Sequence, residues 1–583
     1  NQPEIWVLGT LLLTIGLPYF LLSSNATLIQ RWYYDSFGSS PYFLFSISNI
    51  GSMLGLLAYP FLFEWLLNLQ DQMQWWSRGY MLLTLLLVLL TWVVLKRQKH
   101  YEQRSDMGLG KNLPARNIIK IICYGFIPSS LFLSVTMSVT TDIATFPLLW
   151  IIPLALYLLS FIIVFSKNAE EIILKSQKMH VVAVVLMLVT SLFLATKLEL
   201  LIAFALINFI GFFVVALSIH GQAALEKPKP ESLTFYYFWL SCGGALGGLF
   251  NTVAPYLFDV IYEHYIVLAL SLFALPAKQL WGEQSFRQLR ENKVTIAAVV
   301  LTAIGFVYLV SAEKGGEENK EILYEARSFF GVSRVILDKD EKLTIYKHGT
   351  TVHGFQSESP EHQLDVTSYY VPVKEFLGNL PQQFFAKPFG VLGLGAGTLA
   401  CLGREGQQVD FFEIDPLVIQ IAENEDYFTY VKDCPPDIKL IQGDGRLKLE
   451  AEPDQKYNLL IMDAFTSDAV PLHLLTLEAV NIYLDKIDPN RGILAFNISN
   501  RYMSLHGVLI QIANELGLTP YYLVYKESED KPYDVNSRWL FMLPQQSPWH
   551  KDMLKMGFEA AAPAEGSELW TDSYSNILTV LGK

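Results

Sequence analysis

The chain has 583 residues, of which 52% are hydrophobic and 17% are charged. Soluble domains average about 25% charged residues, so this composition excludes a disordered chain and disfavours an ordinary cytosolic protein. The net charge of −13 also disfavours a nucleic-acid partner, because binding to phosphates requires a basic face.

The charge is divided unevenly between two parts of the chain. Residues 1–312 contain 19 Lys and Arg and 16 Asp and Glu, which gives a net charge of +3. The remaining 271 residues contain 24 Lys and Arg and 40 Asp and Glu, which gives a net charge of −16. The first part therefore indicates a polytopic α-helical membrane domain over residues 1–312, and the second indicates an acidic domain outside the bilayer.

Apolar segments in the first part are long enough, or nearly so, to span a bilayer, which requires about 20 residues. We count ten. The segment 5–23 has no basic region before it, so we interpret it as a retained helix rather than a cleaved signal. The shortest, 260–276, carries Glu263 and His264. The ten expected spans are 5–23, 42–63, 79–95, 118–138, 143–165, 179–196, 199–219, 234–258, 260–276 and 293–311.

Basic residues in the loops predict an orientation, because Lys and Arg concentrate on the cytoplasmic side. The loop 96–120 contains seven Lys and Arg, and every second loop after it is also basic. This pattern places 96–120 in the cytosol. With ten spans, it places the chain after residue 312 on the opposite side.

Two features of the first part carry further expectations. Asp142 stands at the start of a membrane segment, where an ionisable residue is a candidate for function. The alternative is that Asp142 caps the following helix at the interface. The small residues of 241–248 predict that two helices approach closely.

The four cysteines, Cys123, Cys242, Cys401 and Cys434, contain no pair with CxxC spacing. We therefore expect neither a disulfide framework nor a zinc site.

The second part begins with a polar linker at 312–320. Short alternating patterns over 321–385 then predict a small antiparallel sheet, so we assign 313–385 to a linker and β-subdomain. From residue 386 to residue 583, apolar strands alternate with helices, which indicates an α/β domain with a parallel sheet. The expected strands are 389–393, 408–413, 438–441, 457–462 and 492–497.

The ends of these strands carry the candidate site. The first strand enters the glycine-rich turn Gly393-Leu394-Gly395-Ala396-Gly397, which lets the backbone approach a ligand. The next three strands end in acids, namely Glu413, Asp444 (followed by Gly445) and Asp463. Carboxyl ends of parallel strands meet in one crevice, so we expect these acids to converge there. A dinucleotide-binding fold needs only the first of them.

With these motifs, residues 321–583 resemble the polyamine aminopropyltransferases, or spermidine synthases, which share a methyltransferase-like Rossmann fold. Together with the spans before it, the whole chain resembles the bacterial membrane-bound (fused) spermidine synthase-like proteins. The resemblance implies transfer of an aminopropyl group from decarboxylated S-adenosylmethionine to an amine or polyamine, with release of methylthioadenosine. It implies that S-adenosylmethionine, decarboxylated or intact, is a substrate that donates the group, and that the site binds no metal.

The resemblance also assigns roles to residues. Gly393, Gly395 and Gly397 would line the methionine side of the donor, Glu413 would bind its ribose, and Asp444 with Gly445 would bind its adenine. Gln356 resembles a donor-contacting glutamine of the small domain. The catalytic candidates are Asp463, Asp468 and Tyr369, and Asp463 is also a candidate for binding the donor.

The sequence departs from the family pattern in three places. Ala396 replaces an acid that meets the amine of the donor. The motif Tyr369-Tyr370-Val371-Pro372 contains no acid for the acceptor. The acidic loop after the fourth strand reads Asp463-Ala464-Phe465-Thr466-Ser467-Asp468, and its two acids are more widely spaced than usual. We infer that the donor pocket is kept and the acceptor pocket rebuilt.

Three functions follow from these observations. The first is the aminopropyltransferase. The second is an enzyme that uses intact S-adenosylmethionine, either for transfer to another small acceptor or for cleavage or cyclisation of the donor. The third is a sensor or transporter of an adenosyl ligand.

We place the chain in the inner membrane of a bacterium, in contact with the lipid bilayer, and leave a homodimer open. Adenosyl donors are made in the cytosol, whereas the loop charges place the second part outside it. We expect the second part to lie in the cytosol, and we attribute the conflict with the loop charges to 260–276, which would then not be a membrane span.

Overall fold

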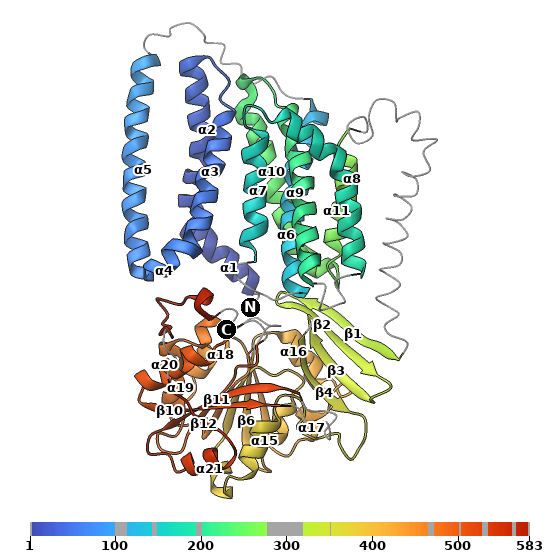
Figure 1. Ribbon diagram of the computed structural model, residues 1–583, viewed down its shortest axis with the longest axis vertical. Helices are drawn as coiled ribbons and strands as arrows, with labels where there is room; N and C mark the ends of the chain where they lie inside the picture. Colours follow the sequence, from blue (N-terminus) through green and yellow to red (C-terminus); the bar gives the residue numbers. More distant parts are fainter. Residues whose placement is uncertain are drawn as a thin grey trace. The chain divides into compact units, whose positions relative to one another are not determined.

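The computed structural model describes residues 3–98, 114–142, 149–193, 201–276, 319–349, 351–464, 471–500, 503–526, 535–562 and 567–580. The described chain divides into two compact units, one formed mostly by helices α1–α11 and one that holds both β-sheets (Figure 1).

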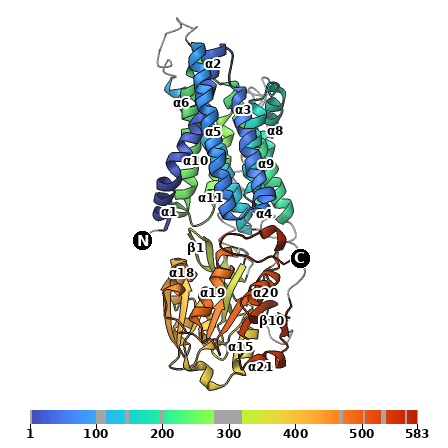
Figure 2. The ribbon, with the colours of Figure 1, turned by 90° about the vertical axis from the view of Figure 1, so that its left-hand side faces the viewer.

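The helices of the first unit run roughly alongside one another (Figures 1 and 2). Helix α7 packs against α3 and α9, and α9 packs against α8. The bounds are α1 Pro3–Leu11, α2 Leu17–Phe37, α3 Phe43–Ala58, α4 Glu64–Leu66, α5 Leu69–Gln98, α6 Ala115–Asp142, α7 Ile151–Val164, α8 Glu170–Phe193, α9 Leu201–Leu225, α10 Leu233–Leu257 and α11 Tyr262–Ala274, with π-helical turns at Leu12–Gly16 and Tyr59–Phe63 and a 3₁₀ turn at Pro230–Ser232.

Six helices within the described ranges are long and apolar enough to cross a membrane. They correspond to six of the ten expected spans and lie at Gly9–Phe37, Phe43–Leu66, Leu69–Lys96, Ala115–Val139, Glu170–Ser191 and Ile202–Leu225. Many large apolar side chains on α2, α3 and α5 are exposed, among them Trp75 and Trp76 on α5. Such a surface suits a lipid environment, and the unit is compatible with a multi-pass membrane protein.

The other four expected spans differ from this group. Helix α10 (Leu233–Leu257) corresponds to the expected span 234–258, but it is not among the six. Helices α7 and α11 have only 14 and 13 residues. The expected span 293–311 lies outside the described residues, as do residues 143–148. Asp142 is the last residue of α6, and the structure does not describe its side chain.

The small residues of α10 bring its backbone against α6, as predicted. A Cβ atom on Gly243 would lie 2.1 Å from the carbonyl oxygen of Ile122, and one on Gly247 would lie 2.6 Å from that of Phe126. Only glycine permits this approach, which is typical of packing between membrane helices.

The second unit begins with an antiparallel sheet of order β1-β2-β3-β4, which confirms the expected β-subdomain fold. Its strands are β1 Lys320–Ser328, β2 Gly331–Asp338, β3 Leu343–His348 and β4 Thr351–Ser357. Helix α15 (Val371–Gly378) and a 3₁₀ turn (Gln382–Ala386) follow.

An eight-stranded sheet of order β12-β10-β11-β9-β8-β5-β6-β7 forms the rest of the second unit. Its strands are β5 Phe389–Leu392, β6 Gln408–Glu413, β7 Asp437–Gln442, β8 Leu459–Met462, β9 Ile493–Asn497, β10 Leu518–Tyr525, β11 Ser537–Pro544 and β12 Glu559–Ala560. The helices are α16 Pro416–Glu423, α17 Tyr430–Asp433, α18 Gly445–Glu450, α19 Leu477–Lys486, α20 His506–Glu515 and α21 His550–Lys555, with 3₁₀ turns at Thr398–Leu402, Leu472–Leu474 and Ile577–Val580.

Strands β5 to β9 pair in parallel, as expected, and β11 then pairs antiparallel with β9 and β10. This arrangement confirms the methyltransferase-type α/β fold. From β5 the sheet continues to β6 and β7 on one side and to β8 and β9 on the other. The neighbouring strands β5 and β8 therefore form a topological switch point, where a crevice for ligands opens.

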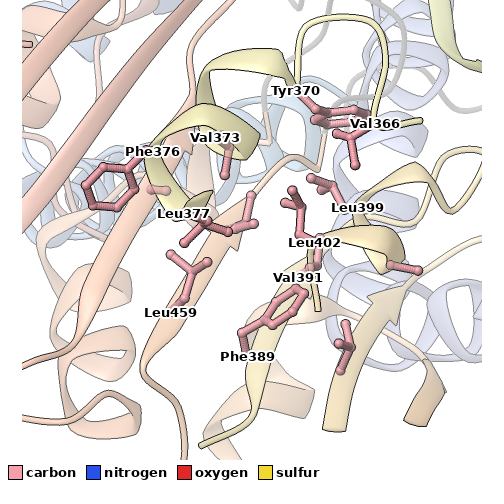
Figure 3. Packing of buried hydrophobic residues seen from close by; sticks show 14 of the residues in the cluster. Val366, Tyr370, Val373, Phe376, Leu377, Phe389, Val391, Leu399, Leu402 and Leu459 are labelled. Atoms are coloured by element: carbon pink, nitrogen blue, oxygen red, sulfur yellow. The ribbon is translucent and has the colours of Figure 1, made fainter. Parts of the chain in front are cut away.

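A buried apolar cluster holds the strands in register beneath that crevice. Figure 3 shows side chains of α15, including Val373 and Phe376, near Val391 of β5 and Leu459 of β8. All four are at most 1% exposed. Burying one such side chain contributes about 1.5–3 kcal/mol, so this packing fixes where the two strands end.

One expectation about the cysteines is wrong. Cys401 and Cys434 form a disulfide across 33 residues. Cys401 lies in the 3₁₀ turn after the glycine-rich loop, and Cys434 directly follows α17. Neither cysteine has a close sequence neighbour to signal the pairing, because the tertiary fold brings them together. Cys123 and Cys242 are free.

Candidate active site

The glycine-rich loop leaves β5 at the switch point and crosses directly over the end of β8. Gly393, Gly395 and Gly397 all have positive φ angles of 99°, 57° and 87°. A Cβ atom on Gly393 would lie 2.4 Å from the carbonyl oxygen of Asp463, and one on Gly395 would lie 2.5 Å from that of His353. Because side chains cannot fit there, the loop holds β8 and β4 close to the crevice.

A cavity of about 280 Å³ opens at this point, and its wall is rich in acids. Glu413, Asp415, Asp444 and Asp463 all line it, together with Gly393, Gly395 and Gly445. The predicted convergence of the strand-end acids thus occurs in the structure. An acidic wall suits a ligand with positive charge.

Asp463 lies at the centre of a hydrogen-bonded group. The phenol of Tyr370 donates to its Oδ2 at 2.6 Å, and the amide of Asn497 donates to its Oδ1 at 2.7 Å. Burial raises the pKa of Asp463 to about 7, although both hydrogen bonds oppose the rise. A carboxyl group with a pKa near the working pH is suited to accept a proton.

Tyr369 extends this group. Its phenol oxygen lies 3.1 Å from that of Tyr370, within hydrogen-bond distance. Burial raises the pKa of both tyrosines well above the usual value. They are therefore neutral near pH 7, and they position groups rather than accept protons.

Glu413 joins the end of β6 to the glycine-rich loop. Its carboxylate accepts hydrogen bonds from the backbone N–H groups of Leu394 at 3.0 Å and Asp415 at 2.9 Å. Burial raises its pKa to about 7, against the effect of these bonds. Each carboxylate oxygen has a second acceptor site, so Glu413 keeps capacity for a ligand.

Asp444 has structural partners of its own. Its carboxylate caps α18 by accepting from the N–H of Leu447 at 2.9 Å, and it lies 3.1 Å from Nε2 of His473. The hydrogen bond from His473 and the cap hold its pKa below the usual value despite partial burial. Asp444 is thus a charged group at the rim of the cavity.

Two predicted donor residues lie elsewhere. Gln356 is buried, and its amide donates to the carbonyl of Gln363 and to Thr429, while its oxygen accepts from the N–H of Thr429. A Cβ atom on Gly397 would lie 3.2 Å from the side chain of Val431. Neither lines the cavity. Asp468 lies outside the described residues.

Sequence reasoning missed Asn497 and a backbone contact made by His353. Asn497 is the last residue of β9. The same signal that identified the acids, a polar residue at the carboxyl end of a parallel strand, therefore also applies to this amide. His353 lies on β4, in the small sheet, and its carbonyl accepts weakly from the N–H of Ala396 at 3.4 Å. No local pattern indicates that contact. Within the described ranges, no cluster of three or more His, Cys, Asp and Glu could hold a metal ion.

Comparison with curated proteins finds a relative that is similar to part of the chain. A polyamine aminopropyltransferase of Vibrio vulnificus (strain CMCP6) is 30% identical over 166 residues, which cover 27% of this chain and 52% of that protein. The chain resembles the polyamine aminopropyltransferases. It spans about half the length of this curated relative. The search against protein families finds no match.

Solved structures also align with part of the chain. Spermidine synthase from Thermotoga maritima is 14% identical with a TM-score of 0.28, and the alignment covers 42% of this chain and 82% of that one. A probable spermidine synthase from Corynebacterium glutamicum ATCC 13032 is 13% identical with a TM-score of 0.33, and the alignment covers 44% of this chain and 98% of that one.

Proposed function

We propose that this chain is a membrane-bound, aminopropyltransferase-like enzyme that alkylates an amine and uses decarboxylated S-adenosylmethionine as the donor. The observation that carries the proposal is Asp463, a buried carboxyl group in an acidic cavity at the switch point, held by Tyr370 and Asn497. The 30% identity to a polyamine aminopropyltransferase supports it.

The chemistry follows from the charges of the two substrates. The nitrogen of a neutral amine attacks the propyl carbon next to the sulfonium, a C–N bond forms, and the C–S bond breaks. The sulfur keeps the electron pair and leaves as neutral methylthioadenosine. The attacking nitrogen loses one proton. Free amines are protonated near pH 7, so Asp463 would orient the ammonium and accept its proton.

The other residues would bind the donor. The backbone at Gly393 and Gly395 lines the cavity and would contact the methionine-derived chain of the donor. The free lone pairs of Glu413 suit the ribose hydroxyls, and Asp444 with Gly445 lies at the rim for the adenine amine. Gln356 would act only through Thr429 and the loop it supports, because its own polar atoms are already bonded.

Mass spectrometry of the products tests this proposal. Purified full-length protein in detergent is incubated with decarboxylated donor and a panel of primary amines, and we expect methylthioadenosine with at least one of them. The absence of methylthioadenosine with every amine, in protein that binds the donor, would overturn the proposal.

An enzyme that uses intact S-adenosylmethionine is the second candidate, and Ala396 favours it. Ala396 is 1% exposed and packs closely on Gly354. A Cβ atom on Gly354 would lie 2.6 Å from the Cβ atom of Ala396. The loop therefore offers no carboxylate to the amine of a decarboxylated donor. Consumption of intact donor, alone or with a small acceptor, would support this candidate. A sensor or transporter of an adenosyl ligand would bind without turnover.

We also propose that the unit with the two sheets lies outside the cytosol. The disulfide between Cys401 and Cys434 supports this side, because disulfides persist in oxidising compartments and are rare in the cytosol. The basic loop at 96–120 points the same way. The donor would then have to cross the membrane, and the helical unit is the candidate for that step.

A further inference from the structure

A second cavity of about 860 Å³ lies next to the acidic one, and the two share His353 and Tyr369 in their walls. It is built by β3, β4, β9, β10 and β11 within the same unit. Asn497 lines the second cavity and also donates to Asp463. A molecule in the second cavity can therefore reach the wall that carries the carboxyl group we propose as the base.

The two cavities differ in charge. The acidic cavity has four carboxylates, whereas the charged groups of the second one are Lys526, Arg538 and Glu341. Lys526 and Arg538 are exposed, and neither forms an ion pair with any residue that the structure describes. Burial lowers the pKa of His353 to about 3, so its ring adds no charge.

Two polar atoms in the second cavity also lack partners. Ser537 is 2% exposed and its Oγ makes no hydrogen bond to the described protein, and the same holds for Nε2 of His353. Buried polar atoms are nearly always bonded, so each unpaired one calls for an explanation. A ligand with acceptor and donor atoms would satisfy both.

We propose that the second cavity binds the acceptor, and that this acceptor is a primary amine whose far end carries an anionic group. The proposal rests on the proposed function. The amine would lie at Tyr369 and Asn497, beside Asp463, and the anion would lie at Arg538 and Lys526. Guanidinium and ammonium groups both bind carboxylates and phosphates. A diamine would instead place its second ammonium beside two cations.

The backbone around Arg538 is firmly held. Its N–H donates to Oγ of Ser499 at 2.9 Å, and the indole of the adjacent Trp539 donates to the carbonyl of Tyr369 at 2.9 Å. The backbone that carries Arg538 and the tyrosine at the shared wall thus keep a fixed spacing, and the reach of the Arg538 side chain from that backbone would limit the length of the acceptor.

Steady-state kinetics with matched acceptors test the proposal. The amines are 4-aminobutanoate, phosphoethanolamine and 1,4-diaminobutane, with decarboxylated donor and full-length protein. We expect a KM for one anionic amine that is lower than for the diamine by at least about tenfold, the ratio for one charged hydrogen bond. Which of the two anionic amines is preferred separates a carboxylate from a phosphate.

Variants identify the cations. Arg538→Gln and Lys526→Gln should each raise the KM of the anionic amine by about tenfold and leave kcat unchanged. Lys551→Gln, an exposed lysine on α21, should change neither. A preference for the diamine, or an unchanged KM in both variants, overturns the proposal.

A binding measurement separates this proposal from the proposed function. If no amine yields methylthioadenosine, saturation-transfer NMR still compares 4-aminobutanoate with 1,4-diaminobutane. Binding of the aminocarboxylate that is lost in the Arg538→Gln, Lys526→Gln double variant supports the anionic site without turnover. Equal signals from wild type and double variant reject it.

Discussion

At the scale of single residues, Asp463 decides the proposed chemistry. The Asp463→Asn substitution keeps the volume and can still bond to Asn497 and Tyr370, but it cannot accept the proton of the amine. We expect kcat to fall by about 10²–10⁴-fold, the usual contribution of a general base, while donor binding measured by calorimetry changes little. Asp426→Asn, an exposed site, is the matched control. Full activity in Asp463→Asn would contradict the role.

The hydrogen bond from Tyr370 predicts a shift in the pH profile. Burial raises the pKa of Asp463 to about 7, and the bond from Tyr370 lowers it. The ionised form is the base, so activity should fall as the pH drops through about 7. In Tyr370→Phe the pKa rises further, and this acidic limb should move upward by about one to two pH units.

Tyr427→Phe is the control for this measurement, because its ring packs against Tyr324 of β1 and does not line the acidic cavity. It should leave the limb in place. If the limb stays fixed in Tyr370→Phe as well, the limb reports the titration of another group.

The position of each residue in the fold explains which site residues the sequence could reveal. Glu413, Asp444 and Asp463 follow predicted strands, so strand order alone brings them to one crevice. Their hydrogen bonds depend on distant contacts, such as His473 on Asp444. Gln356 was selected by resemblance, and its burial against Thr429 depends on packing that no local pattern encodes.

At the scale of elements, the glycine-rich loop makes the site possible. Gly395 has a φ of 57°, and a Cβ atom there would lie 2.5 Å from the carbonyl oxygen of His353. Gly395→Ala should therefore move the loop from β4, at a strain of about 1–3 kcal/mol. We expect donor binding by calorimetry to weaken by about tenfold or more. Gly378→Ala, with open space around it, should bind normally.

The elements themselves were predictable to different degrees. Strands β5 to β9 are short apolar runs between turn residues, so the sequence locates them closely. The antiparallel strands β10 to β12 were missed, because β11 pairs with β9 and β12 pairs with β10 across more than 20 residues. The Cys401–Cys434 disulfide was missed for the same reason, since the fold closes a 33-residue separation that spacing rules do not cover.

At the scale of the whole molecule, the disulfide and the loop charges are independent observations about the same property. The disulfide concerns the redox state around the unit with the sheets. The loop charges concern the insertion of the helical unit. Both favour a location outside the cytosol, and the site of donor synthesis is the argument for the opposite side.

Thiol trapping in intact cells together with a reporter fusion would measure that location directly. In a Cys123→Ser, Cys242→Ser background, the remaining thiols are Cys401 and Cys434. We expect them to resist alkylation in cells until a reductant is added. Alkaline phosphatase fused after Lys583 should be active, and green fluorescent protein at the same position should be dark. Free thiols in untreated cells with a fluorescent fusion would place the unit in the cytosol. That result would also remove the need for the helical unit to deliver the donor.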